Sequence, residues 1–264
     1  MEALTPLVVI HTFISSLLLL PLRDNRPYKS FPIVTLILVG VNTGIFIFTF
    51  YILPMQIGRI PARAVMLTQM LVPAAVIDGV GHGALSMITS AFLHASWLHL
   101  IGNMFFLLFF GRKVEDLLGP VKFLLLYFVC IFVSSIGSVI GEIALPLWHG
   151  AVPNLGASGA IMGVVGAYLF LFSEERIRTL ILVFGFIPVP YLPRMRAWVF
   201  IAYTIADDVL NGFLEEQFQQ LGQEYSSTNS FAHLSGIVAG MLCIYLFLPS
   251  MMLRYRYQPE QKKL

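Results

Sequence analysis

Long apolar stretches separated by short polar or charged segments dominate the pattern of this chain. Six of them approach or exceed the roughly 20 residues that a helix needs to cross the core of a bilayer. They lie at about 33–53, 92–110, 122–145, 157–173, 197–213 and 231–249, and residues 4–22 form a candidate extra N-terminal span or an interfacial segment. No ten-residue alternating pattern of a barrel is present, and backbone groups in lipid must be satisfied internally. The pattern therefore predicts an all-α membrane protein, a bundle of six transmembrane helices with a candidate extra N-terminal span.

Composition supports this class. Hydrophobic residues make up 58% of the chain and charged residues 11%, whereas soluble domains are usually about 45 to 50% apolar. The net charge of +2 is too small to indicate a nucleic-acid partner. We expect an N-terminal apolar segment at 1–22, one core domain at 23–250 and a tail at 251–264.

The basic residues predict an orientation. Of the 16 Lys and Arg residues, 14 fall in the segments that lie on one side of the six predicted helices, at 21–32, 111–122, 174–196 and 250–264. Only Arg59 and Arg63 lie on the other side. The positive-inside rule then places the C-terminus in the cytoplasm. Because no transit peptide is evident, we expect an integral multi-pass protein of a prokaryotic plasma membrane.

One acidic segment without basic residues is predicted to lie on the side of the membrane opposite to the basic segments. Residues 206–230 carry Asp207, Asp208, Glu215, Glu216 and Glu224 without a single Lys or Arg. We therefore expect this segment to be a loop on the outer side of the membrane.

Four polar side chains that are far apart in the sequence share one depth in this topology. Ser158 lies in the first turn of the fourth stretch, and His233 lies near the start of the sixth. His99 and Asn103 lie in the outer half of the second stretch, four residues apart, and so point in a similar direction. A single serine in a membrane helix usually bonds to a backbone or a neighbouring helix. The convergence of all four favours a reactive site.

Small residues provide a way to bring the serine and the histidine together. Close packing of helices in lipid uses small residues at four-residue spacing. Two such stripes occur in the fourth and sixth stretches, namely Gly159, Gly163 and Ala167, and Ala232, Gly236 and Gly240. We expect these stripes to pack against each other, which would bring Ser158 close to His233.

The chemistry of such a site is nucleophilic catalysis. A serine hydroxyl needs a positioned base, and histidine is suited to accept its proton near neutral pH. Attack on a carbonyl creates an oxyanion, for which Asn103, His99 and the Ser158 backbone N–H are candidate donors. We expect no carboxylate in the outer halves of the six stretches to orient His233, so a Ser158–His233 dyad is predicted rather than a triad. No H-E-x-x-H metal motif occurs, and no metal or cofactor is expected.

Three motifs together resemble the rhomboid intramembrane serine proteases. They are "HASWLHLIGN" at 94–103, "GASG" at 156–159 and "AHLSG" at 232–236, the last followed by a further glycine at 240. The resemblance covers about 20–250 and includes "GRKVEDLLG" after the second stretch. One departure is Met162, four residues after the serine, where many members of the family carry an aromatic residue.

The resemblance implies a serine endopeptidase that cleaves transmembrane-helix substrates near the outer membrane face, without a cofactor. It implies Ser158 as nucleophile and His233 as general base. The polar, oxyanion-binding site would then comprise His99, Asn103, Gly156 and Ala157, and His94 would line the cavity near its mouth. Two alternatives remain: a transporter that uses histidine as a proton relay, and a rhomboid-like binding protein without catalysis.

Overall fold

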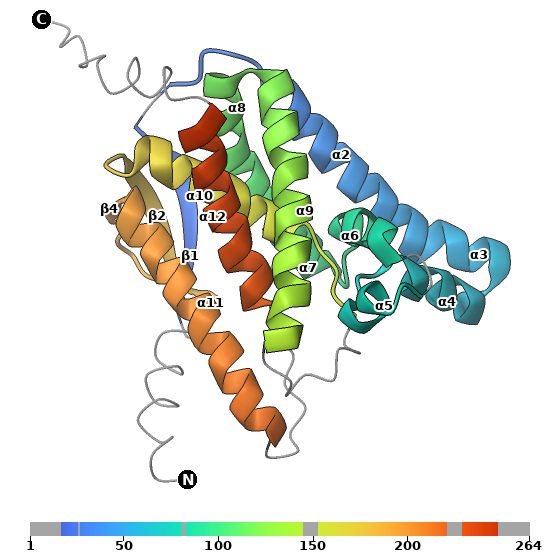
Figure 1. Cartoon of the computed structure of the whole chain (residues 1–264). Helices are drawn as coiled ribbons and strands as arrows, with labels where there is room; N and C mark the ends of the chain where they lie inside the picture. Colours follow the sequence, from blue (N-terminus) through green and yellow to red (C-terminus); the bar gives the residue numbers. More distant parts are fainter. Residues whose placement is uncertain (1–16, 26, 81–82, 145–152, 221–228, 248–264) are drawn as a thin grey trace, which may run out of the picture.

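The computed structural model describes residues 17–25, 27–80, 83–144, 153–220 and 229–247 (Figure 1). Its α-helices are α2 (Ile33–Ile47), α3 (Leu53–Ile57), α4 (Arg59–Gln69), α5 (Pro73–Ile77), α6 (Ser86–Thr89), α7 (Trp97–Phe106), α8 (Arg112–Leu118), α9 (Pro120–Ala144), α10 (Ser158–Phe172), α11 (Ala197–Gln220) and α12 (Ser230–Phe247). Residues 1–16 of the N-terminal segment and the predicted tail at 251–264 lie outside the described residues.

Each of the six predicted apolar stretches contains a helix, namely α2, α7, α9, α10, α11 and α12. At the second stretch the main helix begins at Trp97 and not at residue 92. The fifth helix also continues beyond its predicted end at 213, to Gln220. The described chain is therefore mostly helical.

Within the described residues, two helical segments are long and apolar enough to cross a membrane, judged by length and composition. One is Ile33–Ile57, which runs through α2, a π-helical turn and α3, and the other is Pro120–Gly141 in α9. A pair of segments, Gly83–Phe92 and Trp97–Leu118, is bent by 84° and counts as a third candidate if it forms one span. α10 and α12 are apolar but shorter. Passage of all six helices through the bilayer thus stays a prediction.

A four-stranded sheet corrects the prediction of an all-α fold. β1 (Leu17–Asp24) pairs antiparallel with β2 (Arg176–Val183), and β2 also pairs with β3 (Ile187–Pro188) and β4 (Arg194–Arg196). The last residues of the candidate N-terminal span, 17–22, are therefore a strand and not part of a helix. A short apolar run fits either structure, and the partner strand of β1 lies far along the chain.

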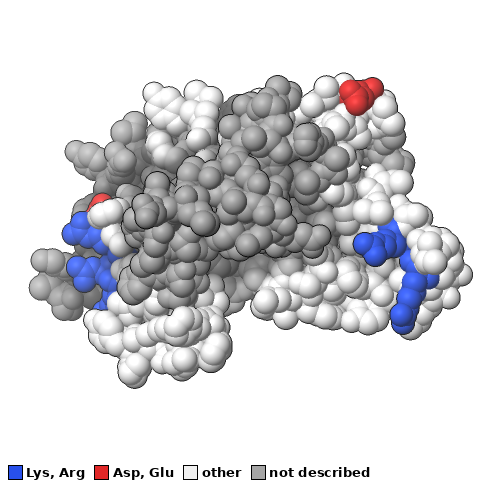
Figure 2. Space-filling view, turned by 90° about the horizontal axis from the view of Figure 1, so that it is seen from below, with Lys and Arg blue, Asp and Glu red and all other residues white. Residues whose placement is uncertain are grey.

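The sheet also carries a group of exposed arginines. Arg178 on β2 lies opposite Arg23 on one side and Arg194 on the other, while Arg176 lies opposite Arg196. The sheet therefore joins two segments, 21–32 and 174–196, that the charge pattern assigns to one side of the membrane. On the face seen in Figure 2, by contrast, most of the described surface carries no charge.

The centre of the molecule is formed by α9, α10 and α12, which lie side by side (Figure 1). α10 is the most enclosed helix, because 11 of its 15 residues are buried. Large aromatic side chains from α10 and from the surrounding elements fill the core, namely Phe46, Phe110, Phe123, Tyr127, Tyr168 and Phe200. The helix that begins with Ser158 is thus held on all sides by the bundle.

A buried carboxylate fixes α8 against the start of α2. Glu115 accepts hydrogen bonds from the N–H groups of Val34 and Thr35, both at 2.8 Å, and from the Thr35 hydroxyl at 2.7 Å. The first N–H groups of a helix have no partner within it, and a carboxylate there also complements the helix dipole. This contact positions the α7–α8 segment, and α7 carries His99 and Asn103.

Candidate active site

The chain turns sharply just before Ser158, and a glycine makes the turn. Gly156 has a φ of +126°, a conformation that residues with a Cβ rarely adopt. Its N–H donates to the Ser90 carbonyl oxygen at 2.9 Å. Ala157 is fully buried, and Ser158 begins α10. The hydroxyl of Ser158 therefore lies at the end of a helix where backbone N–H groups have no intrahelical partner.

His99 and Asn103 lie beside this turn. A Cβ placed on Gly156 would be 2.8 Å from Nε2 of His99 and 3.7 Å from Nδ2 of Asn103. α7 is oriented at its start by Ser96, whose hydroxyl accepts the N–H of His99 at 3.2 Å. The Asn103 amide is buried, and among the described residues its Nδ2 has no hydrogen-bond partner. An amide donor without a partner thus lies close to the turn that precedes Ser158.

The two stripes of small residues form a close seam between α10 and α12. A Cβ on Gly236 would collide with the carbonyl of Gly159, and one on Gly240 would collide with the carbonyl of Gly163. The two backbones are therefore nearer than any larger side chain would allow. At the start of the seam, a Cβ on Gly159 would be 3.6 Å from the Ala232 carbonyl oxygen. The residues next to Ser158 and His233 thus face each other.

His233 is buried and is held by a carboxylate from another helix. Its Nδ1 lies 2.8 Å from Oδ1 of Asp208 on α11, and both side chains are largely enclosed. The start of α12 is capped by Asn229, whose side-chain oxygen accepts the N–H of Ala232 at 2.9 Å. The prediction that no carboxylate could orient His233 is therefore wrong.

That prediction fails because Asp208 falls both in the fifth apolar stretch, 197–213, and in the acidic segment 206–230, and the sequence assigns that segment to a loop. The sequence places Asp208 in an outer loop that begins at residue 206, whereas the structure keeps it within α11, facing α12. One signal could have identified it: ionisable residues inside an apolar helix tend to mark functional sites. Asp208 is such a residue.

In the described part of the chain, no hydrogen bond joins Ser158 to His233. Catalytic hydrogen bonds are often longer in free enzymes than in their substrate complexes. The structure therefore brings the two helix ends together without forming the contact itself.

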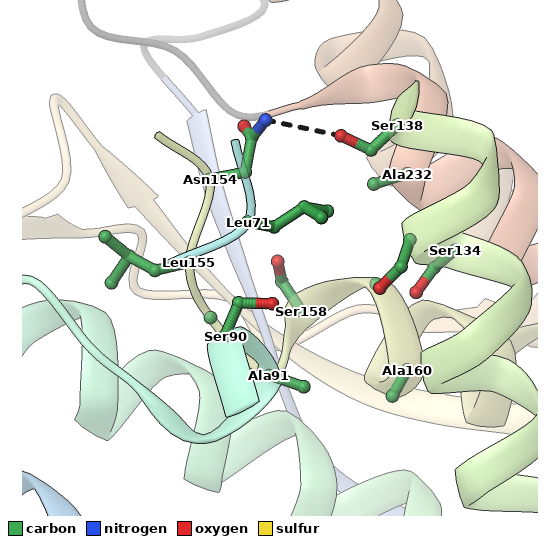
Figure 3. A pocket seen from close by; sticks show the side chains of 13 residues that line it. Leu71, Ser90, Ala91, Ser134, Ser138, Asn154, Leu155, Ser158, Ala160 and Ala232 are labelled. Carbon is green, nitrogen blue, oxygen red and sulfur yellow. Dashed lines mark hydrogen bonds between the residues drawn. The ribbon is translucent and has the colours of Figure 1, made fainter. Parts of the chain in front are cut away.

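A small pocket of about 60 Å³ opens beside Ser158 (Figure 3). Figure 3 shows the Ser158 hydroxyl pointing into it. Further polar side chains line the pocket, namely Ser90, Ser134, Ser135, Ser138 and Asn154. Such a polar space can hold water. Among the described residues, no cluster of three or more His, Cys, Asp or Glu side chains could hold a metal.

His94 does not line this pocket. It is fully buried, and its ring lies edge-on against that of His99 with the centroids 5.1 Å apart. It therefore packs against His99 inside the bundle, and its expected role near the mouth of a cavity stays a prediction.

The comparison with known protein families decides the family. The model of the Rhomboid domain matches residues 81–250, which is well over half of the 264-residue chain. The chain belongs to the rhomboid family. The matched range of this rhomboid includes α7, α10, α11 and α12, which carry His99, Asn103, Ser158, Asp208 and His233.

Three known proteins show how far the similarity extends. The rhomboid protein YdcA of Bacillus subtilis is 30% identical over 171 residues, covering 64% of this rhomboid and 70% of YdcA. RHOMBOID-like protein 1 of Arabidopsis thaliana is 29% identical over 167 residues, or 63% of this chain and 35% of its own. The mitochondrial Rhomboid protein 1 of Saccharomyces cerevisiae is 32% identical over 165 residues, which cover 60% of this chain and 40% of the yeast protein. The match thus spans less than half of the plant and yeast proteins.

Proposed function

We propose that this rhomboid is an intramembrane serine endopeptidase in which Ser158 is the nucleophile and His233 the general base. The family includes intramembrane serine proteases. The observation that carries the proposal is the seam between α10 and α12, because it holds the helix ends that bear Ser158 and His233 against each other. His99 and Asn103 lie at the same end, beside Gly156.

The first half of the reaction is acyl transfer. Nε2 of His233 accepts the hydroxyl proton of Ser158 while Oγ attacks the peptide carbonyl carbon. The tetrahedral intermediate then collapses, the C–N bond breaks, and His233 returns the proton to the leaving amine. The products of this half are an amine fragment and an acyl ester on Ser158.

The oxyanion formed in that attack requires hydrogen-bond donors aimed at the place where charge develops. The Nδ2 group of Asn103 is suited to this role because it is buried without a hydrogen-bond partner among the described residues. The Ser158 N–H lies at the start of α10, where the helix dipole adds positive potential. His99 is the third proposed donor, with Gly156 and Ala157 shaping the turn that positions the site.

Hydrolysis of the acyl ester needs water. The pocket beside Ser158 has five polar side chains in its lining besides the serine itself, and such surfaces stabilise ordered water. A water molecule attacks the ester carbonyl while His233 takes its proton. The bond between the acyl carbon and Oγ of Ser158 then breaks, His233 returns the proton to Oγ, and the fragment with the new carboxyl group is released. No metal or cofactor takes part in this scheme.

The proposed substrates are membrane proteins with a transmembrane helix, cleaved near the outer end of that helix. The apolar helices support a location in a lipid bilayer. The arginine-bearing sheet supports an orientation with that end of the molecule in the cytoplasm, because basic segments are retained there. A prokaryotic plasma membrane, with the C-terminus in the cytoplasm, remains part of the proposal.

Labelling by a fluorophosphonate probe tests the nucleophile. The purified protein in liposomes should be labelled, and Ser158→Ala should abolish the labelling. Ser134→Ala is the matched control, because Ser134 lines the same pocket but bonds to the Ile131 carbonyl of its own helix at 3.0 Å. Labelling that persists in Ser158→Ala, or that is lost in the control alone, would contradict the assignment.

A further inference from the structure

A carboxylate that the proposed dyad does not use lies in the interior of the molecule. Asp208 is 9% exposed and His233 is 7% exposed. Removing a carboxylate from water is costly unless it is paired and hydrogen-bonded. The partner that the structure gives to the Asp208 side chain is Nδ1 of His233, at 2.8 Å. The two groups therefore form a buried pair between α11 and α12.

The same residue is held in place through its backbone. The Ser230 hydroxyl donates to the Asp208 carbonyl oxygen at 2.8 Å, which ties the start of α12 to this turn of α11. A Cβ on Gly212, one turn further along α11, would also meet Cβ of Ser230 at 3.2 Å. Both ends of the Asp208–His233 contact are thus fixed by neighbouring contacts between the same two helices.

The contact determines which nitrogen of His233 can act as a base. An ionised carboxylate can only accept hydrogen bonds, so a neutral imidazole that bonds to it must carry its hydrogen on Nδ1. Nε2 is then left with a lone pair, which is the form that a general base requires. If the ring instead carried its hydrogen on Nε2, that nitrogen could not accept the proton of Ser158.

We infer that Asp208 is a positioning residue that holds His233 in its Nδ1–H form and stabilises the imidazolium formed during attack, so that the site is a Ser158–His233–Asp208 triad. The inference rests on the proposed function. Asp208 acts through His233, and the proton stays on the imidazole throughout. The triad members come from three helices, α10, α12 and α11.

The rival explanation is that the pair only holds α11 against α12. The two explanations predict different rankings of substitutions. A structural contact would tolerate Asp208→Asn, which keeps size and hydrogen bonding, better than Asp208→Ala. A positioning carboxylate predicts the reverse, because the asparagine amide can donate to Nδ1 and so stabilise the unreactive Nε2–H form.

The experiment compares three substitutions at this position with one control. Asp208→Asn should lower kcat by at least about 100-fold with KM within about twofold, since it removes orientation of the base and not substrate binding. Asp208→Ala should lose less than Asp208→Asn, and Asp208→Glu, which keeps the carboxylate, should lose least. Asp207→Asn is the control, because it makes the same change one residue away and should leave kcat near that of the wild type.

Two further readouts distinguish the possible failures. The ¹⁵N chemical shifts of the His233 ring, assigned by comparison with His233→Ala, should report Nδ1–H in the wild type and Nε2–H in Asp208→Asn. Wild-type kinetics and tautomer in Asp208→Asn would overturn the triad while leaving the function intact, as would a loss of activity that only follows a loss of thermal stability. Absence of Ser158-dependent labelling in the wild type would instead overturn the proposed function.

Discussion

The seam between α10 and α12 and the ring of polar side chains around it are built in different ways. In the seam, glycine backbones approach so closely that an added methyl group would collide with a carbonyl. α11 contributes to the site mainly through the Asp208 side chain, which contacts His233, and the Asp208 carbonyl oxygen, which accepts from Ser230 of α12. α11 extends past the lower end of α12 (Figure 1). Backbone contact therefore fixes the positions of the serine and the histidine. Side-chain contacts determine how the histidine is oriented and which hydrogen-bond donors lie near the serine.

Substitutions in these two regions should therefore have different effects. A substitution in the seam should move whole helices and so affect the fold and the activity together. A substitution among the surrounding polar groups should leave the helices in place and affect the reaction rate.

The largest effect is expected from Gly236→Val. The new side chain would meet the carbonyl of Gly159, and backbone on both sides leaves little room to adjust. We expect a loss of about 3 kcal/mol or more in the free energy of unfolding, together with loss of labelling at Ser158. Unfolding of the purified protein by titration with SDS would measure it.

Gly44→Val is the matched control for that substitution. Gly44 lies in α2, and nothing comes within 4 Å of a Cβ placed there. Its stability should change by no more than about 1 kcal/mol. If both valine variants were equally stable, the seam would not be the constraint that the structure indicates.

A narrower effect, on the reaction rate and not on the fold, is expected from Asn103→Ala. Its Nδ2 has no hydrogen-bond partner among the described residues, so its removal should cost little stability. As a donor to the oxyanion, it should lower kcat by about 100- to 1000-fold while KM changes little. Steady-state cleavage of a transmembrane substrate in liposomes would give both constants.

The control here is Asn211→Ala on α11, whose side chain donates to the Asp207 carbonyl oxygen of its own helix at 2.8 Å. It should retain a kcat near that of the wild type. An unchanged kcat with a raised KM in Asn103→Ala would move that residue from the oxyanion site to substrate binding.

The same contrast explains what the sequence could predict. The seam follows from small residues at four-residue spacing, a local pattern with a known consequence for helices in lipid. That pattern predicted the packing of Gly159, Gly163, Gly236 and Gly240, which the structure confirms. The positive φ of Gly156 likewise belongs to a residue type that tolerates it.

The features that the sequence did not predict depend on contacts between distant segments. Leu17–Asp24 forms β1 because it pairs with β2, which lies far along the chain. Its short apolar run alone does not distinguish a strand from the end of a helix. The role of Asp208 depends on its belonging to α11 and not to the acidic loop, and on which face of that helix meets α12. A carboxylate near the end of an apolar stretch fits a loop as well as a buried partner.

Cleavage of a transmembrane substrate by Ser158→Ala, His233→Ala and the double variant tests the central claim most directly. Members of a catalytic unit are not additive, because removing one already disables the others. Each single variant should fall to the background rate, a loss of about 10⁴-fold or more, and the double variant should be no worse than either. Substantial turnover by His233→Ala, or losses that multiply in the double variant, would contradict the claim that Ser158 and His233 act as one unit.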